Sequence, residues 1–473
     1  MSAAGTGQNG AVTSVVIIGG GPGGYEAALV AAQYGADVVV VDRDGIGGSA
    51  VLTDCVPSKA LIAVADAAWS NVESAALGVL VNGSPLDRSQ VSVDLAAVNA
   101  RLLRLVRAQS NDISDRLAAN GVRIIRGTAA LASPTTVVVE GANRREVLAA
   151  DVVLIATGAR PRVLPAAKPD GRRILTWEQV YGLAEVPEHL VVVGSGVTGA
   201  EFASAYRGVG AEVTLVSSRQ QVLPGEDPDA ARVIGEVFGR RGIDVRNGRR
   251  AVAARLDGER EVVVDLDDGS QLRASHVLMA VGSVPNTDAA LGLDSAGVRL
   301  DSRGFVEVDR VSRTSARGVY AAGDCTGVDM LASVAAMQGR IAMWHALGEA
   351  VSPLDLQTVS SNVFTTPELA TVGVTALDVE SGRINAESVL LPLAANARAK
   401  MSNFTDGFVK LFARTGTRIV VGGVVVAPHA SELIYPVAMA VEQRLTVDQV
   451  AQTFTVYPSL TGSIAEVARM LHG

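Results

Sequence analysis

Residues 13–42 read TSVVIIGGGPGGYEAALVAAQYGADVVVVD, and this stretch decides the fold. Val15–Ile18 is a continuous apolar run, as expected for a strand buried inside a parallel sheet. It leads directly into a glycine-rich turn at 19–24, and the Ala-rich segment 25–34 has helical spacing. A second apolar strand then ends at Asp42. This order predicts a strand–turn–helix–strand unit in which the helix N-terminus faces the phosphates of a dinucleotide.

The same unit occurs a second time further along the chain. The apolar run Leu190–Val193 leads into the turn GSGVTG at 194–199, and the helical segment 200–209 precedes another apolar strand at 213–216. In each copy the first glycine allows the tight turn, the second lets the backbone approach a pyrophosphate, and the third lets the helix pack on the strand. The predicted cofactor-binding glycines are Gly19, Gly21, Gly24, Gly194, Gly196 and Gly199.

The residues that end the second strand differ between the two copies. Asp42 is a carboxylate that can bind a ribose hydroxyl, which suits an adenosine without a 2′-phosphate. The second copy ends in Ser217, Ser218 and Arg219, which can bind a 2′-phosphate and include no acid to repel it. We therefore expect NADPH at the second site. If Arg219 is only a solvated surface residue, NADH would serve equally well.

Length and composition restrict the class of protein. The 473 residues correspond to about three domains, and a hydrophobic content of 48% is enough for buried cores. With a net charge of −8 and a pI of about 5.3, we expect no binding to nucleic acid or to an anionic membrane. Two cysteines and five scattered histidines argue against a disulfide scaffold and a metal site. Because the first basic residue is Arg43 and no 18-residue stretch is purely apolar, we predict a cytoplasmic protein without a signal peptide or integral membrane segment.

Several further segments resemble motifs of the flavoprotein disulfide reductases, the family of lipoamide dehydrogenase and glutathione reductase. Residues 47–59 (GGSAVLTDCVPSK) resemble the redox-active segment of that family. Residues 314–324 (TSARGVYAAGD) resemble its second FAD motif. Shorter matches are IATGARP at 155–161, AVGSVPNT at 280–287 and GFVK at 407–410. The resemblance follows the family's order along nearly the whole chain.

The resemblance implies an α/β protein with two Rossmann-like dinucleotide-binding domains and a C-terminal α+β dimerisation domain. The expected parts are a first FAD segment at 1–158, an NAD(P) domain at 159–284, a second FAD segment at 285–351 and an interface domain at 352–473. We expect a homodimer. Asp324 matches the family residue that binds the ribityl chain of FAD. Further expected cofactor contacts are Gly127, Ala129, Thr157, Gly158, Gly282 and Ala332.

The chain departs from the family at the residues that handle a disulfide. The family uses two cysteines, and Ala50 stands where the first is expected, so only Cys55 remains. Tyr457 and Gly462 stand in place of the family's catalytic His and Glu. Disulfide reduction needs an attacking thiolate, a resolving thiol and a base. We therefore do not expect this chain to reduce disulfides by that route.

The residues that assist flavin reduction are retained. Lys59 matches the lysine that lies beside the hydride-accepting nitrogen of the flavin in the family, and Glu201 matches the acid that pairs with it. The chain has only four lysines, so a lysine inside this motif is informative. An ammonium there would stabilise negative charge on the flavin. The alternative is an ion pair that only caps the helix.

The roles of the remaining candidates stay open at this point. Cys55 precedes a helix and a lysine, which lowers a thiol pKa, so it could tune the flavin, be an inert remnant, or act as a peroxidatic thiol. Cys325 follows Asp324 and is expected to be structural. Tyr457 could protonate a reduced substrate, although packing is the simpler role.

These residues predict an FAD-dependent NAD(P)H:quinone oxidoreductase. Hydride would pass from NAD(P)H to FAD and then directly to a flat, apolar quinone or a similar acceptor, with no disulfide relay. Alternatives are a single-cysteine peroxide reductase, a pyridine-nucleotide transhydrogenase and a non-enzymatic nucleotide sensor.

Overall fold

The computed structural model describes residues 12–142 and 144–472, and the chain forms two compact units. Unit 1 comprises Met1–Pro57, Leu103–Arg160 and Ser283–Leu354. Unit 2 comprises Ser58–Leu102, Pro161–Gly282 and Asp355–Gly473. Unit 1 thus brings together segments from the two stretches predicted to bind FAD.

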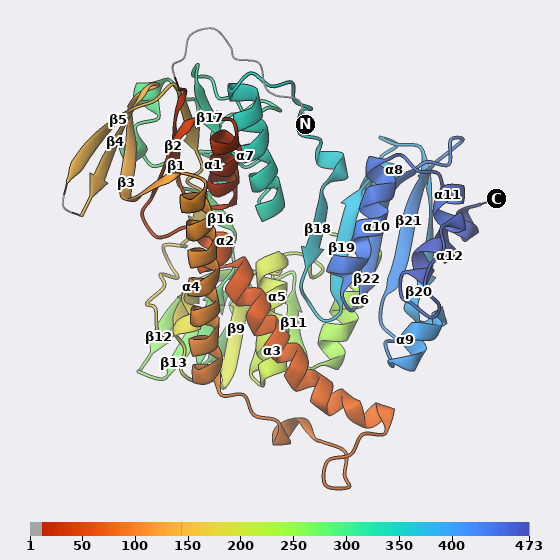
Figure 1. Ribbon diagram of the computed structural model, residues 1–473. Coiled ribbons are helices and arrows are strands. Elements are labelled where there is room, and N and C mark those ends of the chain that lie inside the picture. Colours follow the sequence, from red (N-terminus) through yellow and green to blue (C-terminus); the bar gives the residue numbers. More distant parts are fainter. Residues whose placement is uncertain (1–11, 143, 473) are drawn as a thin grey trace. The chain divides into compact units, whose positions relative to one another are not determined.

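Unit 1 is built on a seven-stranded sheet in the order β17-β6-β1-β2-β3-β4-β5 (Figure 1). The first five of these strands pair in parallel, whereas β3, β4 and β5 pair antiparallel. Helices α1 (Pro22–Gln33) and α7 (Ala332–Ala346) pack against one another. The strands are β1 (Ser14–Ile18), β2 (Asp37–Asp42), β3 (Arg123–Ser133), β4 (Thr136–Gly141), β5 (Arg145–Ala149), β6 (Val152–Ile155) and β17 (Val319–Ala321).

Unit 2 contains a second parallel sheet, in the order β11-β10-β9-β15-β8. Helix α5 (Val197–Val209) follows β9, as the second glycine turn predicts, and helix α6 (Pro228–Arg240) follows β10. Its strands are β8 (Ile174–Thr176), β9 (His189–Val193), β10 (Glu212–Ser217), β11 (Ile243–Asn247) and β15 (His276–Met279). A three-stranded sheet is formed by β12 (Ala251–Asp257), β13 (Glu261–Leu266) and β14 (Gln271–Ala274).

The C-terminal part of unit 2 is an antiparallel sheet in the order β18-β19-β22-β21-β20, with helices beside it (Figure 1). The strands are β18 (Ser360–Val363), β19 (Glu368–Gly373), β20 (Ala386–Pro392), β21 (Phe408–Arg414) and β22 (Val420–Ala427). The helices are α8 (Ala376–Glu380), α9 (Ala397–Met401), α10 (Ala430–Glu442), α11 (Val447–Gln452) and α12 (Gly462–Leu471). Apolar residues of the sheet and of α10 and α12 form one core, which confirms the α+β class predicted for this region.

The remaining elements connect these sheets. They are α2 (Gly48–Leu52), α3 (Cys55–Glu73), α4 (Leu95–Ala119) and the short paired strands β7 (Ala159–Pro161) and β16 (Ser283–Pro285). Within the described residues, one helical segment, Gly48–Leu77, is long and apolar enough to cross a membrane by length and composition. A single such segment is weak evidence, because core helices of water-soluble proteins pass the same test.

Candidate active site

The first glycine turn joins β1 to α1, and at one of its three motif glycines the protein has room for a side chain. A Cβ on Gly19, whose φ is +108°, would lie 2.1 Å from the Ala156 carbonyl oxygen. A Cβ on Gly24 would lie 1.9 Å from the Gly19 oxygen, so both glycines are required by the protein's own packing. Gly21 differs, because its φ is −70° and the nearest atom to a Cβ there would be Gly48 Cα at 3.8 Å.

The second turn, between β9 and α5, repeats this arrangement. Cβ atoms on Gly194 and Gly199 would lie 2.1 Å and 1.8 Å from backbone oxygens. A Cβ on Gly196 would meet nothing within 4 Å, and its φ of −72° suits any residue. The protein itself therefore has room for a side chain at Gly21 and Gly196. A pyrophosphate that approaches the backbone explains why both are glycine, so the two turns fit dinucleotide cofactors.

The predicted FAD residues of unit 1 follow the carboxyl ends of parallel strands. The turn at 19–24 follows β1, Asp42 ends β2, Thr157 and Gly158 follow β6, and Asp324 follows β17. The structure therefore brings them to one edge of the sheet, where open α/β sheets bind ligands. Other predicted contacts lie elsewhere in the same unit: Gly127 and Ala129 in β3, and Ala332 at the start of α7.

Asp42 has a structural role besides its predicted contact with ribose. Its Oδ2 accepts a hydrogen bond of 2.7 Å from the Gly20 N–H. Its Oδ1 accepts bonds of 2.8 and 2.6 Å from the N–H groups of Asp44 and Gly45. The carboxylate thus ties the end of β2 to the glycine turn, and a carboxylate with about four acceptor positions retains capacity for a ribose hydroxyl.

Asp324 is a partly buried carboxylate in the second FAD segment. Burial, together with the charges of Asp54 and Asp329, raises its pKa to about 6. Hydrogen bonds donated by the hydroxyl groups of a ligand would stabilise the charged form of this carboxylate. This fits the ribityl chain of FAD, which the resemblance assigns to Asp324.

The predicted NADP residues of unit 2 share one edge of the second parallel sheet, and of the three at the end of β10 only two face solvent. Ser218 and Arg219 are exposed at the end of β10, and Gly282 follows β15. Ser217 is fully buried; its Oγ lies 2.6 Å from Ser195 Oγ and accepts a 3.2 Å bond from the Arg219 N–H. The Ser217 hydroxyl thus holds the strand end to the glycine turn, and its contact with a 2′-phosphate stays a prediction.

Lys59 and Glu201, 142 positions apart in sequence, form an ion pair within unit 2. The distance from Lys59 Nζ to Glu201 Oε2 is 2.8 Å, and the Glu201 side chain is only 4% exposed. Lys59 lies in the first turns of α3 and Glu201 in α5. A buried carboxylate needs such partners, so the pair is held firmly.

Phe364 completes this pair and was not predicted from the sequence. Its backbone N–H donates a 2.9 Å hydrogen bond to Glu201 Oε1, and its ring lies 4.8 Å from Lys59 Nζ. An aromatic face at this distance attracts an ammonium. A backbone N–H is common to every residue except proline, so no motif could have indicated this contact.

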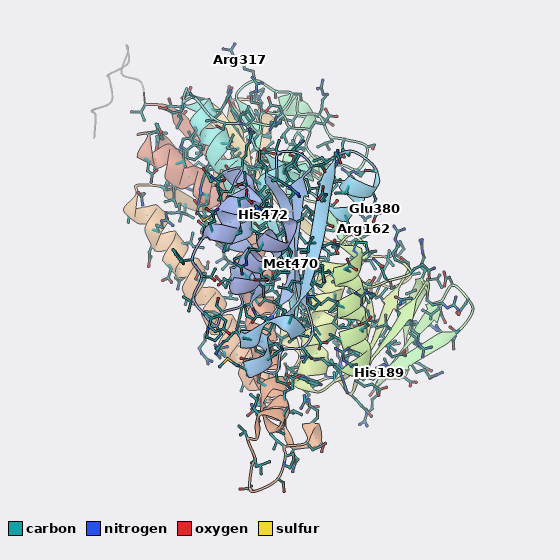
Figure 2. The ribbon with its side chains drawn as sticks, turned by 90° about the vertical axis from the view of Figure 1, so that its right-hand side faces the viewer. Arg162, His189, Arg317, Glu380, Met470 and His472 are labelled. Atoms are coloured by element: carbon teal, nitrogen blue, oxygen red, sulfur yellow. The ribbon has the colours of Figure 1, made fainter. Side chains whose placement is uncertain are left out.

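The other candidates differ in their exposure. Cys55 is the first residue of α3, and Cys325 is fully buried, where burial raises its pKa to about 11 and makes it a poor nucleophile. Tyr457 is 87% exposed in the single chain, and both roles considered for it, packing and protonation of a reduced substrate, stay predictions. Two of the histidines, His189 on β9 and His472 after α12, lie well apart in Figure 2.

Comparisons with known proteins agree with this geometry. Residues 13–339 match the model of the pyridine nucleotide-disulphide oxidoreductases, and residues 359–468 match the dimerisation domain of the same family. The chain belongs to the pyridine nucleotide-disulphide oxidoreductase family. The family uses FAD and NAD(P)H, which confirms the two cofactors predicted for this oxidoreductase.

Relatives within the pyridine nucleotide-disulphide oxidoreductases include quinone and dihydrolipoyl dehydrogenases. The NAD(P)H dehydrogenase (quinone) of Mycobacterium tuberculosis is 51% identical, over 97% of this chain and 94% of that protein. The dihydrolipoyl dehydrogenase of Geobacillus stearothermophilus is 32% identical, over 98% and 96%.

Among solved structures, LpdA from M. tuberculosis has a TM-score of 0.92 at 51% identity, covering 97% of this chain and 100% of that chain. The HOCl-induced flavoprotein disulfide reductase RclA from Escherichia coli has a TM-score of 0.85 at 26% identity, covering 97% of this chain and 99% of that chain. Both likenesses extend over nearly the whole fold.

We expect Asp324→Asn to stabilise the FAD-free protein at pH 8 while weakening its binding of FAD. A carboxyl whose pKa is raised in the folded state costs stability above that pKa, and a shift from 3.8 to about 6 corresponds to about 3 kcal/mol. The variant should therefore gain up to about 3 kcal/mol at pH 8 and almost nothing near pH 4, in urea unfolding.

The matched control for this prediction is Asp151→Asn. Hydrogen bonds from the backbone N–H and the hydroxyl of Ser14 lower the pKa of Asp151, so its replacement should destabilise the protein at pH 8. If Asp324→Asn shows the same pH dependence as the parent protein, the carboxyl is not buried as described. If FAD affinity is unchanged, it does not bind the ribityl chain.

Proposed function

We propose that this protein is an FAD-dependent NAD(P)H:quinone oxidoreductase, in which NAD(P)H, a quinone and a proton yield NAD(P)⁺ and a hydroquinone. The observation that carries the proposal is Ala50 in the redox segment, where a disulfide relay would need a second cysteine. When bound, FAD accepts the hydride and passes two electrons to the quinone. The name of the M. tuberculosis relative, NAD(P)H dehydrogenase (quinone), supports the same acceptor class.

The chain's own residues supply charge and position. As the resemblance implies, the positive charge of Lys59 would stabilise negative charge developing on a bound flavin. Glu201 and Phe364 hold this ammonium in one orientation. Ser218 and Arg219 face solvent where the adenosine end of NADPH would bind. NADH remains the alternative donor, because the preference rests on Arg219.

We further propose that the protein works as a homodimer in the cytoplasm. The dimerisation domain at 359–468 supports the dimer. Its C-terminal part also exposes the apolar and aromatic side chains of Phe454, Val456 and Tyr457, each at least 77% exposed. A contiguous exposed apolar segment of this kind is typical of a protein interface.

The proposal predicts that Cys55→Ser retains steady turnover of a soluble quinone with NADPH, within about twofold of the parent protein, because no thiol step is needed. Turnover and bound FAD are measured together. Cys325→Ser is the matched control, since this buried thiol contacts the Ile155 and Ala322 carbonyl oxygens and is expected to affect stability only.

Loss of all quinone turnover in Cys55→Ser would contradict direct transfer and favour a thiol mechanism. NADPH oxidation driven by peroxide, present in the parent protein and abolished in Cys55→Ser, would instead select the single-cysteine peroxide reductase.

A further inference from the structure

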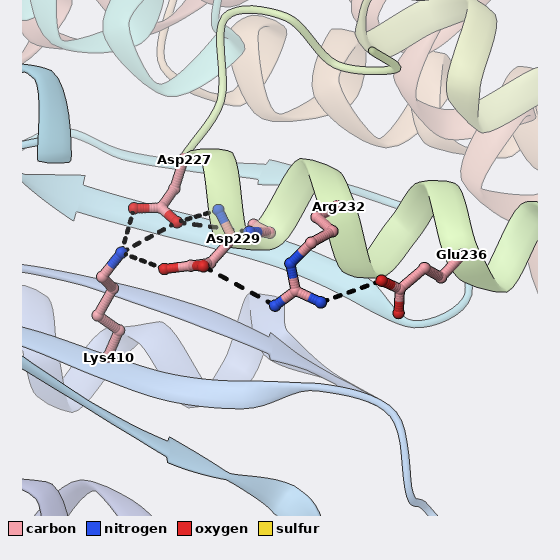
Figure 3. A network of polar contacts seen from close by, with 6 residues as sticks. Asp227, Asp229, Arg232, Glu236 and Lys410 are labelled. Atoms are coloured by element: carbon pink, nitrogen blue, oxygen red, sulfur yellow. Dashed lines mark hydrogen bonds and ion pairs between the residues drawn. The ribbon is translucent and has the colours of Figure 1, made fainter.

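The motif GFVK at 407–410 ends in a lysine that the proposed function does not use. Lys410 lies in β21, and its side chain is 9% exposed. Its Nζ lies 2.9 Å from Asp227 Oδ2, 3.2 Å from Asp227 Oδ1 and 2.9 Å from Asp229 Oδ2 (Figure 3). A strand of the C-terminal sheet is thereby joined to the start of α6, which belongs to the nucleotide-binding part of the same unit.

The acid at the centre of this cluster also begins a helix. Asp227 is the N-cap of α6, and its Oδ1 accepts hydrogen bonds from the N–H groups of Asp229 and Ala230 at 3.0 and 3.4 Å. Its side chain is only 3% exposed. Both oxygens of the Asp227 carboxylate therefore accept hydrogen bonds. The carboxylate links the first turn of α6 to the Lys410 ammonium.

Asp227 also ends the connection that carries the proposed 2′-phosphate residues. This connection, 218–227, starts at the buried Ser217 hydroxyl, which contacts Ser195 Oγ. In its middle, the Leu223 N–H donates a 2.8 Å bond to the Ser195 carbonyl oxygen, and Leu223 is 1% exposed. The connection is thus attached to the glycine turn at two points and to the C-terminal sheet at its far end through Lys410.

Lys410 also compensates negative charge around the start of α6. Glu226, Asp227 and Asp229 are three acids within four positions, and burial together with the charge of Asp227 raises the pKa of Glu226. Lys410 is the described cation closest to Asp227, because Arg232 contacts Asp229 and Glu236 instead (Figure 3). Without Lys410, the negative charges of Glu226 and Asp227 would be uncompensated at the end of the connection that must bind an anionic nucleotide.

We propose that Lys410 is a positioning residue for the nicotinamide nucleotide, which fixes the connection 218–227 from the C-terminal sheet without contacting the nucleotide. The inference rests on the proposed function, because it assigns nucleotide binding to this connection. Removal of Lys410 loosens one end of the connection and leaves its acids uncompensated. Both effects lower nucleotide affinity and leave the Lys59–Glu201 pair in place.

The test measures NADP⁺ binding to the oxidised FAD-containing protein by calorimetry, alongside NADPH:quinone kinetics. We expect Lys410→Met to raise the dissociation constant and the KM for NADPH about tenfold, a typical coupling between sites, with kcat changed less than twofold. Lys400→Met is the control, because this lysine of α9 in the same domain is exposed. Lys410→Arg, which keeps the charge, should recover part of the affinity.

Asp227→Asn provides a second variant, because asparagine caps a helix as well as aspartate does but carries no charge. It should weaken NADP⁺ binding in the same direction, and the double variant should lose no more than Lys410→Met alone. If Lys410→Met fails to fold, the NADP⁺ affinity of Asp227→Asn tests the inference instead. Unchanged NADP⁺ affinity with a lowered Tm would overturn the inference and leave Lys410 a structural residue. If the parent protein itself binds no NADP⁺, the proposed function fails instead.

Discussion

Lys59→Met is expected to slow the reduction of the bound flavin by NADPH about 10²- to 10³-fold, the typical cost of removing one preorganised charge from a developing negative charge. Methionine has nearly the length of lysine, so the change removes the ammonium and retains most of the apolar stem. Glu201, with a side chain only 4% exposed, keeps its hydrogen bond from the Phe364 N–H. The rate is measured anaerobically from the loss of flavin absorbance after rapid mixing.

Lys168→Met is the matched control for this rate, because Lys168 is exposed and outside the candidate site. Glu201→Gln separates charge pairing from packing, since the amide oxygen can still accept from the Phe364 N–H. It should slow the flavin step less than Lys59→Met does. A Lys59→Met rate equal to that of the parent protein would show that the pair only stabilises the fold, as a helix-capping ion pair would.

Gly21→Ala and Gly196→Ala are expected to separate the two cofactors. A Cβ at either position has room within the protein, at 3.8 Å or more from its neighbours, and both φ values suit alanine. Gly21→Ala should therefore fold and weaken FAD binding, and Gly196→Ala should retain FAD and weaken NADP⁺ binding. Loss of one charge-assisted hydrogen bond to a pyrophosphate costs about 1.5–3 kcal/mol, which is about a 10- to 100-fold weaker affinity.

Two further glycines serve as controls for this pair. Gly19→Ala should prevent folding of unit 1, because its Cβ would overlap the Ala156 oxygen and its φ is +108°. Gly235→Ala, inside α6 with no atom near its Cβ, should be neutral or stabilising. Equal cofactor affinities in the parent protein and both test variants would mean that neither turn approaches a pyrophosphate.

The two dinucleotide-binding turns could be predicted because they depend on local chemistry. Apolar strands, glycines at fixed spacing and an Ala-rich helix act within about 30 residues, and their steric requirements can be read from the residue types. The absence of a second cysteine at Ala50 is equally a property of the sequence alone. Lys59 and Glu201 were predicted through the resemblance, and the structure adds their 2.8 Å contact.

Other features of the site depend on contacts between distant segments. Phe364 reaches Glu201 through a backbone N–H, which carries no signal in its residue type. Ser217 turns inward because Ser195, from the preceding glycine turn, lies beside it. Lys410 meets Asp227 only because the antiparallel sheet packs beside α6.

The amino-acid sequence by itself determined the two cofactor turns, the α/β class and the missing disulfide relay. The tertiary structure decided which polar groups of distant segments meet, and hence which hydroxyl faces solvent and which lysine contacts the N-cap of a helix. The physical reason is that backbone sterics act between neighbouring residues, whereas buried polar groups are satisfied by whichever partners the packing of sheets and helices brings near.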